Sequence, residues 1–252
     1  MKKIILLILS ISTFYTFSFA MENNTTSLIT DKYYLEYKEN KDLGNRKEAL
    51  EALIKSADGG FEKAIEELSE SYKNGSLGII DYKQALKLEI NLAEKGKTRS
   101  LTNIGIMYMN GQGVEKNYEK ALEYFLEATE KKDMKAPRYL GIFYEKGYGV
   151  KTDYIRAFQY YEIGANNNDI TSQFYLGQLY EKGLGTEKNY DLAMKWYLKS
   201  AERGDIIASP AMIAIGNLYK KGLGITQNED IAKQWYKKAA ITGNEEAINI
   251  LK

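Results

Sequence analysis

The sequence predicts an all-α fold, an α-solenoid in which antiparallel helix pairs stack one after another. Three observations favour this fold: a repeat length of 36 residues, columns of tyrosine and glycine that keep this spacing, and apolar stripes at helical spacing in both halves of the repeat. Helix-turn-helix units of this length stack into solenoids because each unit buries its apolar face only against its neighbours. We call the first helix of each unit helix A and the second helix B.

The repeat length follows from residues that recur in register. Tyr72, Tyr108, Tyr144 and Tyr180 are each 36 residues apart (108 − 72, 144 − 108, 180 − 144), and Tyr219 follows after 39 (219 − 180). The last junction therefore contains three extra residues. A glycine column keeps the same spacing; its members are Gly105, Gly141, Gly177 and Gly216.

The first 20 residues differ from the rest and predict a signal peptide. Lys2 and Lys3 form a basic start, residues 4–17 are largely apolar, and residues 18–20 supply small side chains before a cleavage site. The apolar stretch is shorter than the roughly 20 residues that span a bilayer, and no other segment is apolar enough. We therefore expect an exported protein, periplasmic or secreted, with no membrane span after signal cleavage.

The remaining chain divides into three parts. Residues 21–60 form a diverged N-terminal capping repeat, which lacks the Gly-x-Gly loop, and residues 61–244 form five repeats. Residues 245–252 begin a C-terminal capping helix. The first full copy departs from the others, because Leu88 and Glu89 stand where helix B carries aromatic residues elsewhere.

The copy that starts at Ala136 shows how helix A is built. Ala136, Leu140 and Tyr144 recur at i, i+4 and i+8, so they lie along one side of a helix. Gly141 costs about 1 kcal/mol relative to alanine in a helix interior, and we expect another backbone to approach it closely. The loop from Gly147 to Gly149 then ends the helix, since glycine adopts the positive φ of a tight reversal.

Helix B of the same copy carries a one-sided stripe of small and aromatic residues. Asp153 or Thr152 caps its start, and the two adjacent tyrosines Tyr160 and Tyr161 are its main anchors. Both prolines fall in first turns of helices rather than in their interiors. Pro137 starts the helix A described above, and Pro210 follows Ser209, which we expect to be an N-cap.

These residues carry a resemblance to a known family. The pattern A-x-x-x-L-G-x-x-Y-x-x-G-x-G, followed by K-A-x-x-W-Y-x-K-A-A-x-x-G, resembles the Sel1-like repeat, a relative of the tetratricopeptide repeat, over residues 64–244. The resemblance implies a right-handed α-solenoid of stacked helix pairs. It also implies a scaffold or adaptor that binds protein or peptide partners.

Composition excludes several classes of chemistry. The chain contains no histidine and no cysteine, which removes Ser-His-Asp and Cys-His catalysis and ordinary zinc or copper sites. No serine has a lysine three positions later, as a Ser-x-x-Lys nucleophile requires. We therefore expect no enzyme activity, no metal and no cofactor. Signal cleavage leaves 33 basic residues (35 − 2) against 34 acidic ones, and this balance argues against a nucleic-acid partner.

Two other functions stay open. The chain could be a cell-wall or β-lactam-directed hydrolase or binder, like the exported cysteine-rich relatives of the family, although their paired cysteines are missing here. It could instead be an immunity or inhibitor protein that binds one specific partner. Acidic pairs such as Glu66 with Glu70, or Glu145 with Glu181, could serve acid/base chemistry, but we interpret them as solvated helix faces.

The predicted binding surface is the side of helix A that faces away from its Ala/Leu/Tyr stripe, which lines the concave surface of stacked helix pairs. Apolar residues would form a strip there, with hydrogen-bonding groups beside it, and such a strip suits an extended peptide or a helix. Alternatively, these apolar residues pack against a neighbouring helix. The predicted contact residues are Thr102, Ile106, Met109, Arg138, Ile142, Glu145, Phe174, Gln178, Glu181 and Asn217.

Overall fold

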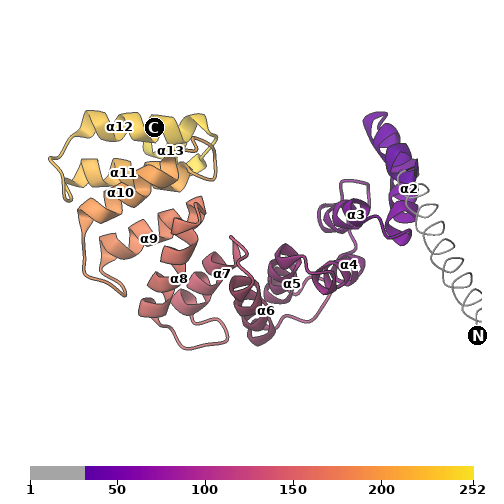
Figure 1. Ribbon diagram of the computed structural model, residues 1–252. Helices are drawn as coiled ribbons and strands as arrows, with labels where there is room; N and C mark the ends of the chain where they lie inside the picture. Colours follow the sequence, from indigo (N-terminus) through magenta and orange to yellow (C-terminus); the bar gives the residue numbers. More distant parts are fainter. Residues whose placement is uncertain (1–31) are drawn as a thin grey trace, which may run out of the picture. The chain divides into compact units, whose positions relative to one another are not determined.

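A computed structural model describes residues 32–252, so the predicted signal peptide lies outside the described residues. The described part is helical and contains no strand, which confirms the predicted all-α fold of paired helices (Figure 1). The chain divides into two compact units, the first ending at Lys116 and the second starting at Asn117. We describe each unit by itself.

The first unit contains a helical segment over residues 32–42 and four further helices. Among these four helices, each one packs against the next along the chain. Its core is formed by buried residues that include Tyr37, Leu53 and Leu92. The four helices are α2 (Arg46–Asp58), α3 (Glu62–Asn74), α4 (Tyr82–Glu94) and α5 (Thr98–Asn110).

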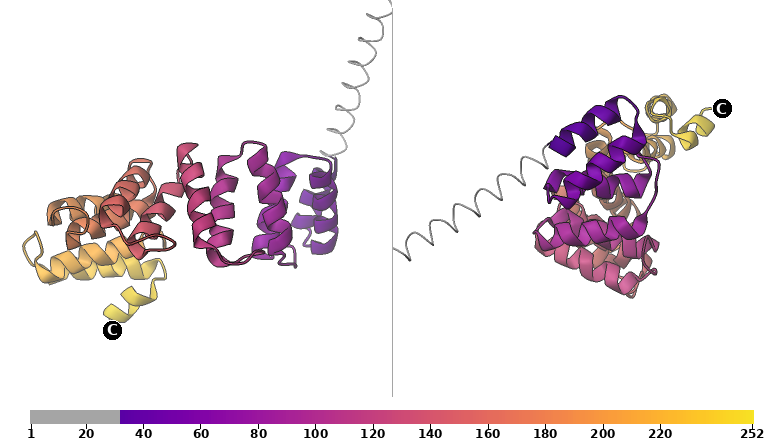
Figure 2. Two further views of the ribbon diagram at one scale, coloured as in Figure 1. Left: turned by 90° about the horizontal axis from the view of Figure 1, so that it is seen from below. Right: turned by 90° about the vertical axis from the view of Figure 1, so that its right-hand side faces the viewer.

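The second unit contains eight helices, α6 to α13, and successive helices again lie side by side (Figure 2). Two clusters of buried residues form its core, one around Tyr161 and one around Tyr197 and Tyr236. The bounds are α6 (Tyr118–Glu130), α7 (Ala136–Lys146), α8 (Tyr154–Asn166), α9 (Ile170–Lys182), α10 (Tyr190–Ala201), α11 (Ser209–Lys221), α12 (Glu229–Ile241) and α13 (Glu245–Ile250).

The turn between α7 and α8 confirms the predicted loop chemistry. Gly147 has φ of 70° and its N–H donates to the Phe143 carbonyl, which ends α7 in a left-handed cap. Asp153 then caps α8, because its carboxylate accepts the Arg156 N–H at 3.0 Å. The two caps together fix where the chain reverses between the helices.

The glycine column mainly accommodates aromatic rings. The predicted close backbone is found at Gly177, where a Cβ would lie 3.2 Å from the Ala193 carbonyl oxygen. A Cβ at Gly141 would lie 2.4 Å from the Tyr161 ring, and a Cβ at Gly177 would lie 2.6 Å from the Tyr197 ring. Gly216 stands in the same relation to Tyr236, at 2.5 Å. In these three repeats helix A carries glycine because the ring of a tyrosine on the following helix B occupies the space of a side chain.

The two adjacent aromatic residues of helix B are not equivalent. Tyr161 and Tyr197, the second of each pair, are fully buried, whereas Tyr160 and Trp196, the first of each pair, are half-buried. The second residue is the anchor, because it points at helix A of its own repeat.

The start of α11 corrects the prediction that Ser209 is an N-cap. Ser209 is the first residue of the helix, and its hydroxyl donates to the Ile206 carbonyl at 2.7 Å. Asp205 instead accepts the N–H groups of Ile207 and Ala208, each at 3.1 Å. Asp205 can accept these hydrogen bonds because the three extra residues of this junction form a turn before the helix. Pro210 lies in the first turn, as predicted, and so does Pro137 in α7.

Candidate functional site

Seven of the ten predicted contact residues lie in the second unit, on α7, α9 and α11. All seven are half-buried: Arg138, Ile142, Glu145, Phe174, Gln178, Glu181 and Asn217. The other three lie on α5 in the first unit. Ile106 and Met109 are half-buried, but Thr102 is only 2% exposed, so its side chain offers almost no surface to a partner. We call the seven residues of the second unit the helix A surface.

Three polar residues of this surface accept hydrogen bonds from buried tyrosines of helix B. The Tyr161 hydroxyl donates to Glu145 Oε2 at 2.8 Å, and the Tyr197 hydroxyl donates to Glu181 Oε2 at 2.6 Å. In the next repeat an amide takes this role, because the Tyr236 hydroxyl donates to Asn217 Oδ1 at 2.8 Å. Glu145 and Glu181 are therefore hydrogen-bonded acceptors rather than fully solvated side chains.

The tyrosines stay protonated and act as donors. Burial raises the pKa of the Tyr161 hydroxyl far above its usual value, and the negative charge of Glu145 raises this pKa further. The pKa of Tyr197 is raised in the same direction by burial and by the hydrogen bond to Glu181. Each tyrosine therefore donates a hydrogen bond to a carboxylate at neutral pH.

Arg138 was predicted as a hydrogen-bond donor for a partner, and the structure shows it already paired. Its guanidinium donates to Asp169 Oδ2 at 3.0 Å and lies 4.9 Å from the centre of the Tyr139 ring. Asp169 also caps α9, accepting the Ser172 N–H at 2.7 Å. Within residues 32–252 the side-chain amide of Gln178 makes no hydrogen bond, and this side chain is half-buried.

The apolar residues of the surface were expected either to form an exposed strip or to pack against a neighbouring helix, and each of them does part of both. Phe174 packs on core tyrosines, with its ring centre 5.5 Å from that of Tyr175 and 5.9 Å from that of Tyr197. Ile142 packs against the cluster around Tyr161. Both side chains nevertheless remain partly exposed. Their inner faces support the core, and their outer faces can contact a partner.

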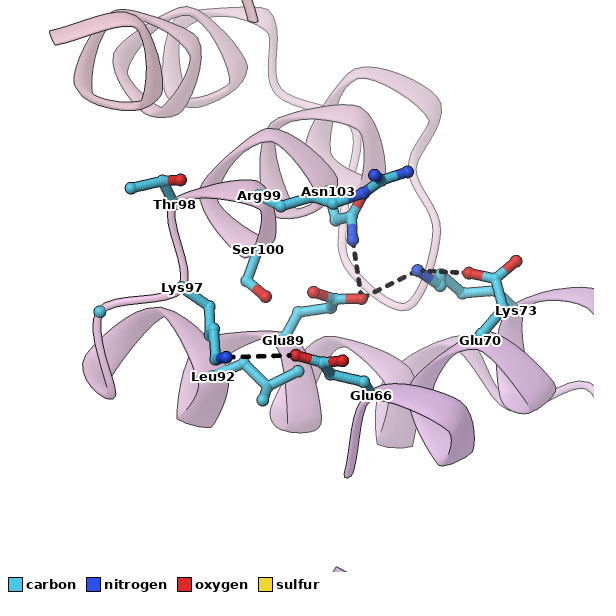
Figure 3. Close-up of a pocket in the computed structure, with 11 residues that line it drawn as sticks. Glu66, Glu70, Lys73, Glu89, Leu92, Lys97, Thr98, Arg99, Ser100 and Asn103 are labelled. Carbon is cyan, nitrogen blue, oxygen red and sulfur yellow. Dashed lines mark hydrogen bonds and ion pairs between the residues drawn. The ribbon is translucent and has the colours of Figure 1, made fainter. Parts of the chain in front are cut away.

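A second candidate site is a pocket of about 450 Å³ in the first unit (Figure 3). We call it the Glu89 pocket, after the carboxylate at its centre. Glu89 is on α4 and its side chain is only 3% exposed. The pocket is lined by Glu66, Glu70, Lys73, Glu89, Leu92, Gly96, Lys97, Thr98, Arg99, Ser100 and Asn103.

One oxygen of Glu89 receives three hydrogen bonds, and the other receives none. Ser69 Oγ donates to Oε1 at 2.7 Å, Lys73 Nζ at 2.8 Å, and Asn103 Nδ2 at 3.0 Å. Oε2 is buried without a hydrogen bond in the described structure. The Ser100 hydroxyl nevertheless lies beside the carboxylate and is among the groups that lower its pKa (Figure 3).

Two lysines at the pocket each form ion pairs with two glutamates. Lys73 pairs with Glu89 and also with Glu70, at 3.1 Å. Lys97 pairs with Glu62 and, at 3.6 Å, with Glu66. Burial alone would raise the pKa of the Glu89 carboxyl, but the charge and hydrogen bond of Lys73, with further hydrogen bonds from serine, bring this pKa below its usual value. Glu89 is therefore ionised at neutral pH.

The pocket exists because one repeat departs from the pattern at three matched positions. Two repeats further on (72 residues), Gly141, Glu145 and Tyr161 stand where this repeat has Ser69, Lys73 and Glu89. The buried tyrosine and its acceptor are thus replaced by a buried carboxylate and a lysine. From the sequence we noted only that Glu89 replaces an aromatic residue. The accompanying replacements at Ser69 and Lys73 were the signal that would have identified this pocket.

Within residues 32–252, no helix is long and apolar enough to cross a membrane. The same residues contain no group of three or more acidic side chains arranged to hold a metal ion.

Comparisons with known proteins identify the repeat. A family model described as Sel1 repeat matches residues 98–133, 137–169, 170–205 and 209–244. A Sel1 repeat protein from Oxalobacter formigenes is 30% identical, with a TM-score of 0.74, over 84% of this chain and 86% of that chain. A comparison with curated proteins found no match.

Two further solved structures are similar. The protein c5321, described as a protective antigen of uropathogenic Escherichia coli with an SLR fold, is 26% identical with a TM-score of 0.72. The match covers 95% of this chain but 50% of c5321, so this chain spans half the length of that protein. The immunity protein PA5088 from Pseudomonas aeruginosa is 17% identical, with a TM-score of 0.57 over 86% of this chain and 82% of that chain, and shares the fold alone.

Proposed function

Because this chain belongs to the Sel1 repeat family, whose four matched segments span more than half of it, we propose that it is an exported, non-catalytic protein that binds a protein or peptide partner. The observation that carries the proposal is the helix A surface of α7, α9 and α11. It combines the outer faces of Ile142 and Phe174 with the uncommitted amide of Gln178. Apolar anchors beside a hydrogen-bonding group suit a peptide or a helix.

The non-catalytic part of the proposal rests on the state of the acidic side chains. Glu145 and Glu181 each accept a hydrogen bond from a buried tyrosine, and Glu66 is paired with Lys97. Carboxylates that are committed in this way support the fold rather than hydrolysis. Turnover of a cell-wall or β-lactam substrate by the purified protein would contradict the proposal.

Export is proposed from the basic and apolar start of the chain. A reporter enzyme that is active only outside the cytoplasm, fused after residue 60, should be active. Leu7→Arg should abolish its activity, because the substitution places a charge in the middle of the apolar segment. Equal reporter activity with and without Leu7→Arg would rule out this route.

Site-specific crosslinking tests the binding surface. A photo-crosslinking amino acid at Gln178 should capture a partner in the native cell envelope. The matched control is the same substitution at Gln159, an exposed glutamine on α8, and it should capture little. In a pull-down without the photo-crosslinking residue, the triple variant Arg138→Ala, Phe174→Ala, Gln178→Ala should then lose the partner while it remains folded. Unchanged capture by the folded triple variant would exclude this surface.

A further inference from the structure

Another pocket, of about 320 Å³, lies in the second unit, where α12 packs against both α11 and α13 (Figure 1). We call it the Lys220 pocket. The buried residues Ala232 and Tyr236 line it from within the helix pair. Its charged lining residues are Lys220 on α11 and Glu229, Lys233 and Lys237 on α12, and all four are exposed.

The lining of this pocket has an excess of two positive charges (3 − 1). Within residues 32–252, Glu229 is the one carboxylate side chain of the lining, and none of the three lysines forms an ion pair. The protein therefore does not neutralise this charge itself. An anionic group placed between the lysines is attracted by several ammonium groups at once, whereas a cationic group is repelled.

Lys220 stands at a position that has a different role in the two preceding repeats. There the position is occupied by Glu181 (220 − 39) and Glu145 (181 − 36), and each glutamate accepts a hydrogen bond from a buried tyrosine. A lysine ammonium cannot accept, so Tyr236 donates to Asn217 instead. The last repeat thus supports its tyrosine with another residue and presents a cation to the pocket.

The two lysines of α12 also differ in kind from the residues they replace. Lys233 and Lys237 correspond to Met194 and Leu198 of the preceding repeat, 39 residues earlier. Exposure to solvent explains polar side chains at these positions, but acidic residues satisfy solvent as well as basic ones do. Like charges that lie close together repel each other. Lysine at all three positions therefore favours an anionic ligand over simple solvation.

We infer that the Lys220 pocket binds an acidic side chain, aspartate or glutamate, of a peptide partner. The carboxylate lies among the three ammonium groups, and Ile250 and Leu251 offer apolar surface to the methylene groups that precede it. The volume is at the low end of ligand pockets and suits one side chain with its flanking backbone.

The inference rests on the proposed function in one respect, that the ligand is a peptide. Lys220 lies three residues after Asn217 of the helix A surface, and residues at this spacing are neighbours on a helix. A single partner can therefore contact both places.

The experiment uses capped peptides, Gly-Gly-X-X-Gly-Gly, with glutamate, glutamine or lysine at both X positions. Binding to the full mature chain is measured by NMR titration, in which the methyl groups of Ile250 and Leu251 report on the pocket directly. We expect the glutamate peptide to shift these signals and to bind about fivefold more tightly than the glutamine peptide. The difference should shrink as sodium chloride is added, and the lysine peptide should not shift the signals.

Two variants separate binding from folding. Lys220→Glu restores the residue of the two preceding repeats, so it should stay folded and bind the glutamate peptide no better than the glutamine peptide. The double variant Lys233→Gln, Lys237→Gln should weaken the glutamate peptide about threefold or more. The matched control is Lys151→Gln, Lys195→Gln, on two exposed lysines outside the lining, and it should bind as the wild type does.

Three results would overturn the inference: equal binding of the glutamate and glutamine peptides, undiminished binding by either folded pocket variant, or an equal loss in the control variant. Such a failure is distinct from failure of the proposed function, because crosslinking from Gln178 tests the helix A surface independently. If the glutamate peptide binds but crosslinking from Gln178 captures no partner, the Lys220 pocket stands and the helix A surface does not.

Discussion

The ring of Tyr161 on α8 lies directly over Gly141 on α7, so a methyl group at residue 141 would be 2.4 Å from the ring. The same pair of positions recurs as Gly177 with Tyr197 and as Gly216 with Tyr236. Each contact joins helix A to helix B of one repeat. The glycine removes the side chain that would separate the two helices, and the tyrosine fills the space with a large apolar ring.

Gly141→Ala should destabilise the protein by about 1–3 kcal/mol. The added methyl group overpacks the interface, and this cost exceeds the gain of about 1 kcal/mol in helix propensity. Urea unfolding followed by circular dichroism measures the difference. In the background Tyr161→Leu, whose side chain lacks the ring, the same substitution should cost much less. An equal cost in both backgrounds would show that the ring is not the cause.

Tyr161→Phe should cost about 1–2 kcal/mol, because it removes the hydrogen bond to Oε2 of the half-buried Glu145, whose Oε1 still accepts from Lys146. The control is Tyr175→Phe. Tyr175 stacks on Tyr161 at 4.9 Å, and within residues 32–252 its hydroxyl makes no hydrogen bond. Denaturant unfolding should show little change for this control. Equal losses for the two variants would contradict a specific role of the Glu145 contact.

The stability contributed by Glu89 should depend on pH. The pKa of Glu89 in the folded protein lies below its ordinary value of 4.5, so the folded state favours the ionised form. This contribution is therefore fully present above about pH 4.5 and is lost as the pH falls through the lower folded pKa. Glu89→Gln should be less stable than the wild type at pH 7, and the difference should shrink towards pH 3.

Free energies of unfolding at several pH values between 3 and 7 test this expectation. A difference between wild type and Glu89→Gln that stays constant over this range would show that the ionised carboxylate contributes nothing. Glu94→Gln, on an exposed residue of the same helix, controls for a general effect of charge removal.

Asp169→Ala should cost about 1–2 kcal/mol, because it removes the cap of α9 together with the partner of Arg138. Asp169→Asn should cost less, since asparagine is also a good N-cap and only the charge is lost. Thermal unfolding compares the two. If asparagine is as damaging as alanine, the ion pair with Arg138, and not the cap, is the main contribution.

Much of the fold is predictable from sequence because the repeats reinforce one another. The helix pairs, the left-handed cap at Gly147 and the cap at Asp153 follow from local rules that act within a few residues. The start of α11 was predicted less well. Three extra residues allow Asp205 to cap the turn before the helix, and Ser209 becomes the first helical residue.

The candidate sites were less predictable than the fold. Residues on one face of helix A could be named from the helical period, but their partners come from helix B or from the next repeat. Glu145 binds the hydroxyl of Tyr161, 16 residues away (161 − 145), and Arg138 binds Asp169, 31 residues away. Helical spacing contains no information about such contacts. Four residues expected to face a partner in fact bind other side chains of the protein: Arg138, Glu145, Glu181 and Asn217.

By itself, the sequence determined the repeat, the helical class and the absence of histidine and cysteine chemistry, because these depend on residue identity and spacing alone. Only the tertiary structure decided the role of each position that recurs in the repeats. It showed that glycine makes room for a tyrosine ring, and that Ser69, Lys73 and Glu89 meet in one pocket. The physical reason is that ring packing and buried ion pairing depend on side chains from separate helices, and their distances are fixed only when the helices pack.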